Sequence, residues 1–222
     1  MQGSNGNTTR ERILVCAADL FAEKGFTETT IREIAEAVGV KGSSIYNHFV
    51  SKNMILEHML REYSSYNTDV FQDKDIYGIL KNDPTPNGVL SCLQLAFPPT
   101  KQTYFLKVLC VMLQEQFRNP IVRGYMAEHY ILRSEKNIAT IIGVLKQLGV
   151  IREDADPDYW IKADSGLFYT FAARMMLGIG DSAPGYTGKS MGDMLRYTFE
   201  LLFTMYGTEK ARSAALSGDG GS

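Results

Sequence analysis

Cysteine and histidine are scarce in this sequence of 222 residues, which contains three of each. The cysteines, Cys16, Cys92 and Cys110, are odd in number and widely spaced, so they form neither a disulfide framework nor a zinc-ligand pattern. A reducing, cytoplasmic environment is therefore expected rather than secretion. The scattered histidines indicate no metal site or catalytic cluster, and no cofactor is expected.

Long apolar runs are also missing. No stretch reaches the roughly 18 uninterrupted apolar residues that a membrane-spanning helix needs. The polar residues 1–9 lack the apolar segment of a signal peptide. No membrane partner is expected.

An excess of basic charge is absent too. The formal net charge is -2, which excludes a protein that coats nucleic acid by its overall charge but leaves a local basic face open. Apolar residues make up 45% of the chain. Since a chain of this length buries roughly 70% of its unfolded surface, it needs no metal or disulfide to fold.

Helical periodicity runs through the chain, whereas strand-like alternation is lacking. Thr30 and Glu33 form a capping box, Gly39 is a typical helix end, and residues 82–88 are the clearest break. The fold is therefore expected to be all-α. The apolar stripes predict helices over residues 13–24, 31–38, 45–49, from 51 onward, and over 89–97, 103–117, 121–148, 157–177 and 191–206.

Residues 30–49 have the layout of a helix-turn-helix motif. No acidic residue lies between Glu36 and Glu57, as a surface facing phosphates requires. Small side chains let a helix approach the major groove closely, where Ser, Asn and Lys can bond base edges or phosphates. The second helix of the motif offers such a small, polar face, formed by Lys41, Gly42, Ser43, Ser44 and Asn47.

The charge argument holds only locally, because residues 1–60 contain six Lys/Arg and seven Asp/Glu. Three residues of the motif have alternative interpretations. Tyr46 and His48 fit either packing or a phosphate contact, whereas Phe49 is predicted to be a packing residue.

Together these N-terminal motifs resemble the DNA-binding domain of the TetR (tetracycline-repressor-like) regulators. The segments that carry the resemblance are Ile13-Leu14 to Ala17, Leu20-Phe21-Ala22-Glu23-Lys24-Gly25-Phe26, Thr29-Thr30-Ile31, Ile34-Ala35, Gly39-Val40, Ile45-Tyr46-Asn47-His48-Phe49 and Ser51-Lys52.

The resemblance implies a three-helix DNA-binding head joined by a fourth helix to a larger helical domain that binds a ligand and dimerises. The implied divisions are a flexible N-terminus (1–9), a helix-turn-helix head (10–55), a ligand-binding and dimerisation domain (56–207) and a disordered tail (208–222).

Single residues acquire roles from the same resemblance. Thr30 is implied to meet a phosphate at a helix start, Tyr46 and His48 to grip the DNA backbone, and Lys52 to contact a phosphate at the next helix start. Lys41 stands where many members carry a capping hydroxyl. It therefore becomes a candidate phosphate or guanine contact.

The resemblance also implies a function, that of a ligand-responsive regulator and not an enzyme. It would act as a repressor that binds a near-palindromic operator as a homodimer and is released by a small apolar or amphipathic effector. The two recognition helices would then lie one DNA turn, about 34 Å, apart.

Aromatic and methionine side chains are numerous in the larger domain, where they suit either a core or a pocket for apolar ligands. The candidate pocket residues are Tyr104, Met112, Phe117, Tyr130, Trp160 and Phe168. The last two predicted helices resemble the family's dimer-forming pair, with candidate interface residues Leu167, Phe171, Met175, Met194, Leu195, Leu202 and Met205.

One motif points to a different class of protein. Ala183–Ser190 matches a relaxed phosphate-loop pattern, in which Lys189 and Ser190 would contact phosphates and magnesium. A phosphate loop follows a buried strand, however, whereas this segment follows a helical pattern. A nucleotide-binding enzyme is therefore the weaker alternative, and an interhelical loop is the preferred interpretation.

Overall fold

The computed structural model describes residues 8–72, 75–95, 102–176, 191–209 and 211. Over these residues the regular elements are helices, and the extended pairing is an isolated bridge between Ile151 and Gly207. The prediction of an all-α fold is confirmed. No helix in these ranges is both long and apolar enough to cross a membrane.

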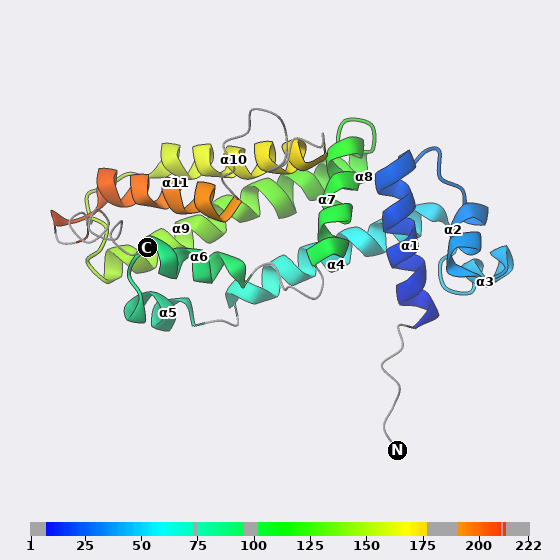
Figure 1. Ribbon diagram of the computed structural model, residues 1–222, viewed down its shortest axis with the longest axis horizontal. Coiled ribbons are helices and arrows are strands. Elements are labelled where there is room, and N and C mark those ends of the chain that lie inside the picture. Colours follow the sequence, from blue (N-terminus) through cyan, green and yellow to red (C-terminus); the bar gives the residue numbers. More distant parts are fainter. Residues whose placement is uncertain (1–7, 73–74, 96–101, 177–190, 210, 212–222) are drawn as a thin grey trace, which may run out of the picture. The chain divides into compact units, whose positions relative to one another are not determined.

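The chain forms two compact units, one from residues 1–66 and 99–128 and the other from residues 67–98 and 129–222. Helix α4 begins in the first unit and ends in the second. The first unit contains α1 (Thr9–Lys24), α2 (Ile31–Val38), α3 (Gly42–Tyr46), the start of α4 (Lys52–Gln72), α7 (Gln102–Glu115), α8 (Pro120–Tyr125) and the first half of a π-helical turn, η1 (Met126–Ile131) (Figure 1).

Local sequence signals set the helix boundaries of the first unit. Thr30 and Glu33 form the predicted capping box at the start of α2, and Gly39 ends this helix in the left-handed conformation with φ of 76°. The Ser51 hydroxyl accepts a hydrogen bond from the Met54 amide at 3.1 Å and so caps α4, the helix that the sequence predicts from residue 51 onward. Thr8 caps α1, which therefore begins within the N-terminal segment expected to be flexible.

Helix α1 packs against both α2 and α7. Phe21 of α1 is fully buried and meets the ring of Phe26 edge to face, with 5.1 Å between centroids. An ion pair joins Lys107 of α7 to Asp19 of α1. Helix α7 therefore belongs to the same compact unit as the predicted head, although residues 56–101 separate the two in sequence.

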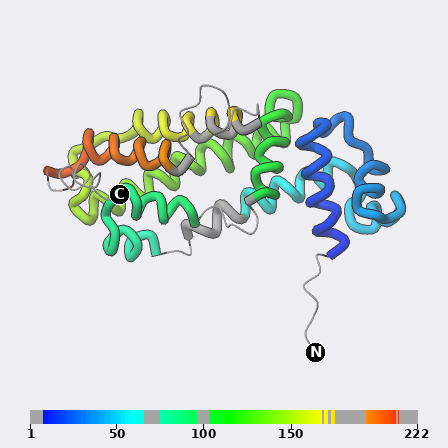
Figure 2. Tube along the Cα trace, viewed as in Figure 1, coloured from blue at the N-terminus to red at the C-terminus, as the bar shows by residue number. Residues whose placement is uncertain are grey.

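The second unit contains α5 (Ile76–Asn82), α6 (Pro86–Gln94), α9 (Leu132–Gln147), α10 (Asp158–Met176) and α11 (Met191–Tyr206). Helix α10 packs against α9 and α11, and α6 packs against α5 and α11. Figure 2 traces the backbone of these helices in the same view as Figure 1. Leu80, Ile141 and Phe199 lie in its apolar core.

The predicted break at residues 82–88 is a tight corner between α5 and α6. Thr85 caps α6 and Pro86 occupies its first turn. A Cβ at Gly88 would stand 1.8 Å from the carbonyl oxygen of Asp83, so only glycine fits there. Helix α5, which precedes the corner, is absent from the predicted helices.

Of two further predictions, one is wrong in part and the other falls on residues that the structure does not describe. The segment 121–148, predicted as one helix, is divided into α8, the turn η1 and α9. The phosphate-loop-like segment Ala183–Ser190 lies outside the described residues, as do residues 1–7 and 212–222 of the two predicted tails.

Candidate nucleic-acid interface

Helix α3 presents a polar surface between two buried anchors. Ile45 within the helix and Phe49 just after it are fully buried. The side chains predicted to meet DNA lie on the exposed part of α3 and its flanks: Lys41, Ser43, Asn47 and His48 are exposed, Tyr46 is 54% exposed, and Gly42 and Ser44 are half-buried. Neither Tyr46 nor His48 is part of the core.

The packing role predicted for Phe49 is confirmed. The Arg10 guanidinium lies 5.1 Å from the Phe49 ring centroid, and the His58 ring meets it edge to face at 5.4 Å. Arg10 also donates to Nδ1 of His58 at 3.0 Å. Burial, followed by the positive charge of Arg10, lowers the pKa of His58 below its usual 6.5. This cluster fastens the end of α3 to α1 and α4.

Lys41 and Gly42 start α3 without the usual hydroxyl cap. Within the described head, the Lys41 side chain makes no capping hydrogen bond, although its carbonyl accepts from the Ser44 amide at 2.8 Å. Beside Gly42 there is open space, since no described atom apart from its chain neighbours and the nearby backbone of α3 lies within 4 Å of the position a Cβ would take. Both features leave the first turn of α3 accessible to a large partner.

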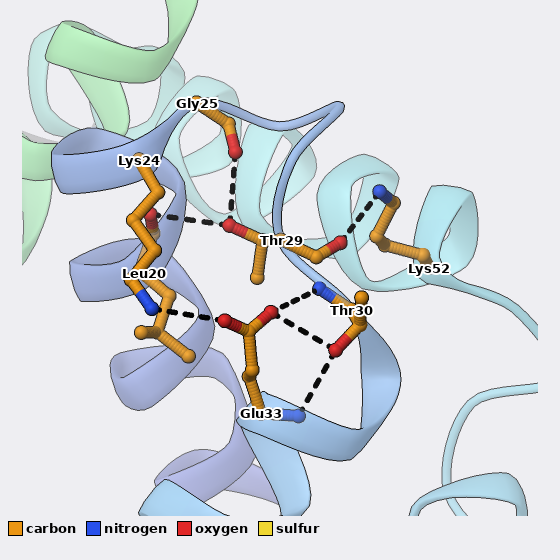
Figure 3. Close-up of polar contacts among 7 residues, drawn as sticks. All are labelled: Leu20, Lys24, Gly25, Thr29, Thr30, Glu33 and Lys52. Atoms are coloured by element: carbon orange, nitrogen blue, oxygen red, sulfur yellow. Dashed lines mark hydrogen bonds and ion pairs between the residues drawn. The ribbon is translucent and has the colours of Figure 1, made fainter.

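Thr30, predicted to meet a phosphate, is engaged in its own capping box. Its hydroxyl accepts from the Glu33 amide at 3.2 Å and donates to Glu33 Oε2 at 2.9 Å (Figure 3). Lys24 holds the other carboxylate oxygen at 2.9 Å. The carboxylate of Glu33 accepts hydrogen bonds from Lys24, from the Thr30 amide at 2.8 Å and from the Thr30 hydroxyl, and these bonds, that from Lys24 first, lower the pKa of Glu33 to about 2. The network fixes the first turn of α2.

Lys52, also predicted to contact a phosphate, has its ammonium turned into the head. It donates to the carbonyl oxygens of Phe26 at 2.6 Å, Thr27 at 3.1 Å and Thr29 at 2.7 Å. The nitrogen also lies 4.6 Å from the centroid of the Phe26 ring. Burial lowers the pKa of Lys52.

The six candidate pocket residues do not gather in one unit. Tyr104, Met112 and Phe117 belong to the first unit and the other three to the second. Tyr104 donates to Glu62 Oε2 at 3.0 Å, and burial raises its pKa. Met112 is fully buried, whereas Phe117 is 77% exposed and therefore lines no interior space.

Trp160 of the second unit lies beside Phe199, with 5.1 Å between ring centroids. One turn along α10 from Trp160, the buried Asp164 accepts a hydrogen bond from Thr198 at 3.1 Å. Its other oxygen, Oδ2, has no partner among the described residues. Trp160 and Phe168 remain candidate pocket residues. Asp164 is one of several polar residues that the sequence offers on these helices as possible ligand contacts, and the sequence alone does not separate it from a surface acid.

The candidate dimer residues divide between surface and core. Leu202 is fully buried in its own unit, so its side chain is not available to a second copy. Leu167 and Met205 are exposed, Met194 and Leu195 are half-buried, and the side chains of Phe171 and Met175, like that of Phe168, lie outside what the structure describes. Tyr197, Leu201 and Met205 form an exposed apolar stripe on α11, and of these three residues the sequence predicted Met205.

The comparison with known sequences concerns the head. Residues 13–59 match the profile of the family described as "Bacterial regulatory proteins, tetR family". The HTH-type transcriptional repressor KstR2 of Mycolicibacterium smegmatis is 41% identical over 54 residues, which are 24% of this chain and 26% of that protein. IcaR of Staphylococcus aureus, a negative transcriptional regulator of the biofilm operon icaADBC, is 36% identical over 73 residues, or 32% and 39% of the two chains. The match thus spans well under half the length of either relative.

Solved structures extend the likeness of fold to most of the chain. A transcriptional regulator from Saccharomonospora viridis in complex with choline has a TM-score of 0.65 at 22% identity, over 90% of this chain and 98% of that one. KstR2 of Mycobacterium tuberculosis has a TM-score of 0.57 at 21% identity, over 92% and 98%. At these identities the likeness concerns the fold alone. Because residues 13–59 match the family's profile and contain the helices α2 and α3 of a helix-turn-helix, the N-terminal domain of this chain is a TetR-family DNA-binding domain.

Proposed function

We propose that this protein is a transcriptional regulator that binds a near-palindromic DNA operator as a homodimer and responds to a small-molecule effector. The observation that carries the proposal is the small, polar, exposed face of α3, held in place by the buried Ile45 and Phe49. We propose a repressor because the relatives KstR2 and IcaR are named as a repressor and a negative regulator.

The residues of the head divide by chemistry. Ser43, Ser44 and Asn47 supply short hydrogen-bonding groups for base edges, and the missing side chain of Gly42 permits close approach. Tyr46 and His48 extend polar groups from the end of α3, where they suit backbone phosphates. The ammonium of Lys41 is exposed and suits a phosphate or guanine contact.

A homodimer is proposed because a single small head binds too weakly to compete with the many nonspecific sites of a genome. Tyr197, Leu201 and Met205 recur at every fourth position of α11 and are all exposed, from 39% to 57%. Such a stripe is suited to burial against the same helix of a second copy, and Leu167 of α10 adds to the exposed apolar surface.

For the effector we propose a site in the second unit near Trp160 and Asp164. The rings of Trp160 and Phe199 pack together, and the buried Asp164 lies one turn along α10 from Trp160. Because Oδ2 of Asp164 has no hydrogen-bond donor among the described residues, a small amphipathic ligand with an N–H or O–H group would supply one. The choline complex of the Saccharomonospora viridis regulator supports a small organic molecule as the class of ligand.

Selection of binding sites from random duplex DNA tests the regulator. The expected result is enrichment of two inverted half-sites whose centres lie about 34 Å apart, one turn of DNA. A chain with Ser43, Ser44 and Asn47 all changed to alanine is the control, because its fold should persist while its selected sequence changes. Purified protein that enriches no sequence and binds no duplex would refute the proposal.

Fluorescence of Trp160, the only tryptophan of the chain, tests the effector site. A bound ligand should change the emission and weaken operator binding together. The Asp164→Asn variant should lose ligand affinity while it still binds the operator. Ligands that weaken operator binding equally in both proteins would place the site elsewhere.

A further inference from the structure

The loop between α1 and α2, residues 25–30, is tied to the start of α4 by a single side chain. Three of its backbone carbonyls, those of Phe26, Thr27 and Thr29, converge on the Lys52 ammonium at 2.6–3.1 Å. Figure 3 shows the last of these bonds, which crosses from the loop to the first residue of α4.

The hydrogen-bonding capacity of Lys52 is fully used by this arrangement. A protonated lysine has three N–H donors and no acceptor, and the head supplies three carbonyl acceptors. The ring of Phe26 covers the same nitrogen at 4.6 Å. A DNA phosphate could bind this ammonium only by displacing a carbonyl that would then lose its partner.

Other contacts hold the loop from its opposite sides. The Thr29 hydroxyl donates to the carbonyls of Leu20 at 3.2 Å and Gly25 at 2.9 Å, which fixes the loop to α1 (Figure 3). The carboxylate of Glu115 in α7 accepts from the Phe26 amide at 3.3 Å. Lys52 is thus the connection to α4 in a loop that is already fastened to α1 and α7.

We propose that Lys52 is a positioning residue for DNA binding and not a phosphate contact. By fastening the loop to α4, it fixes the start of α2 with Thr30 relative to Tyr46 and His48, which lie just before α4 in the chain. The inference rests on the proposed function, since it concerns how the head presents its DNA-binding surface.

The salt dependence of operator binding separates the two roles. Each lost phosphate contact lowers the slope of log affinity against log salt by about 0.9, hence by about 1.8 for the two heads of a dimer. Lys52→Met removes the ammonium and keeps most of the stem, and Lys52→Gln is a second variant that retains two N–H donors. Lys41→Met is the matched control, because Lys41 is exposed in the same head.

All four proteins are compared between about 50 and 200 mM salt, at a temperature where circular dichroism shows each variant fully folded. Lys52→Met should bind the operator roughly tenfold more weakly or worse, as expected for a lost charge-assisted bond, with an unchanged salt slope. Lys52→Gln should fall between it and the wild type, and Lys41→Met should lose slope. Amide hydrogen exchange at residues 26–30 should accelerate in Lys52→Met but not in Lys41→Met.

Three results would overturn the inference. A slope reduced in both Lys52 variants as in Lys41→Met would make Lys52 a phosphate contact. Wild-type affinity in folded Lys52→Met would leave it a purely stabilising role. Wild-type protein that binds no duplex would refute the proposed function and this inference with it. The other two results would overturn this inference alone and leave the proposed function intact.

Discussion

Thr198 of α11 donates a hydrogen bond to Oδ1 of Asp164 in α10 at 3.1 Å, yet the buried Oδ2 of the same carboxylate has no partner among the described residues. Burial raises the pKa of Asp164 to about 6, and the Thr198 bond, which lowers it, compensates only in part. At neutral pH the ionised carboxylate, with a hydrogen bond to only one of its oxygens, therefore destabilises the native fold.

Asp164→Asn is expected to stabilise the unliganded protein at neutral pH. The folded pKa of Asp164 lies above the ordinary value of 3.8, so its contribution to stability is greatest below pH 3.8 and is lost as the pH rises through about 6. The neutral amide removes the ionic cost, a gain of about 1–3 kcal/mol at neutral pH. Urea unfolding of both proteins measures it, and the gain should shrink near pH 4. An equal gain at both pH values would contradict the assigned cause.

His58→Gln should make the stability of the first unit less sensitive to acid. Burial and Arg10 lower the folded pKa of His58 below 6.5. Its contribution is therefore complete above that pH and is lost as the pH falls through 6.5 toward the folded value. Wild-type protein should lose more stability than His58→Gln between about pH 7.5 and 5 in urea unfolding. Parallel losses in the two proteins would show that other groups control the acid response.

The sequence predicted those features that depend on neighbouring residues. The capping box of Thr30 and Glu33, the left-handed Gly39 and the polar face of α3 all lie within a few positions of their signals, and the structure contains each of them. The partners of Lys52 could not be predicted in this way. They lie 23 to 26 positions away, and only the folded head brings them together.

Apolar residues on more than one side of a helix limited the prediction for α11. Leu201 and Leu202 are adjacent in sequence, but about 100° of helix rotation separates them. Leu201 is 39% exposed and Leu202 is fully buried, and periodicity alone could not say which of the two sides faces the core. The pocket role predicted for Phe117 has a related weakness. Its aromatic ring favours burial, but the residue follows the end of α7 and is 77% exposed.

Gly42→Ala is expected to weaken DNA binding without harm to the fold. No described atom would meet the new methyl group, so the free protein should keep its melting temperature or gain slightly from the higher helix propensity of alanine. Against a duplex the methyl group holds α3 away from the groove, and affinity should fall. The control is Gly39→Ala, which forces alanine into φ of 76° and should lower the melting temperature. Unchanged operator affinity in folded Gly42→Ala would mean that this turn does not approach DNA closely.

Tyr46→Ala and Asn47→Ala should have different effects on specificity. Tyr46 is 54% exposed, and its hydroxyl is proposed to meet a phosphate, which carries no sequence information, so the loss of Tyr46 should weaken binding to operator and random DNA by the same factor. Asn47 is proposed to read a base edge, and its loss should cost about 1–3 kcal/mol at one position of each half-site and little elsewhere. Binding measurements on the operator, on a random duplex and on single-base variants distinguish the two patterns. If Asn47→Ala lost the same affinity for every sequence, Asn47 would contact the phosphate backbone and not a base. Ser43 and Ser44 would then be the residues that read the bases.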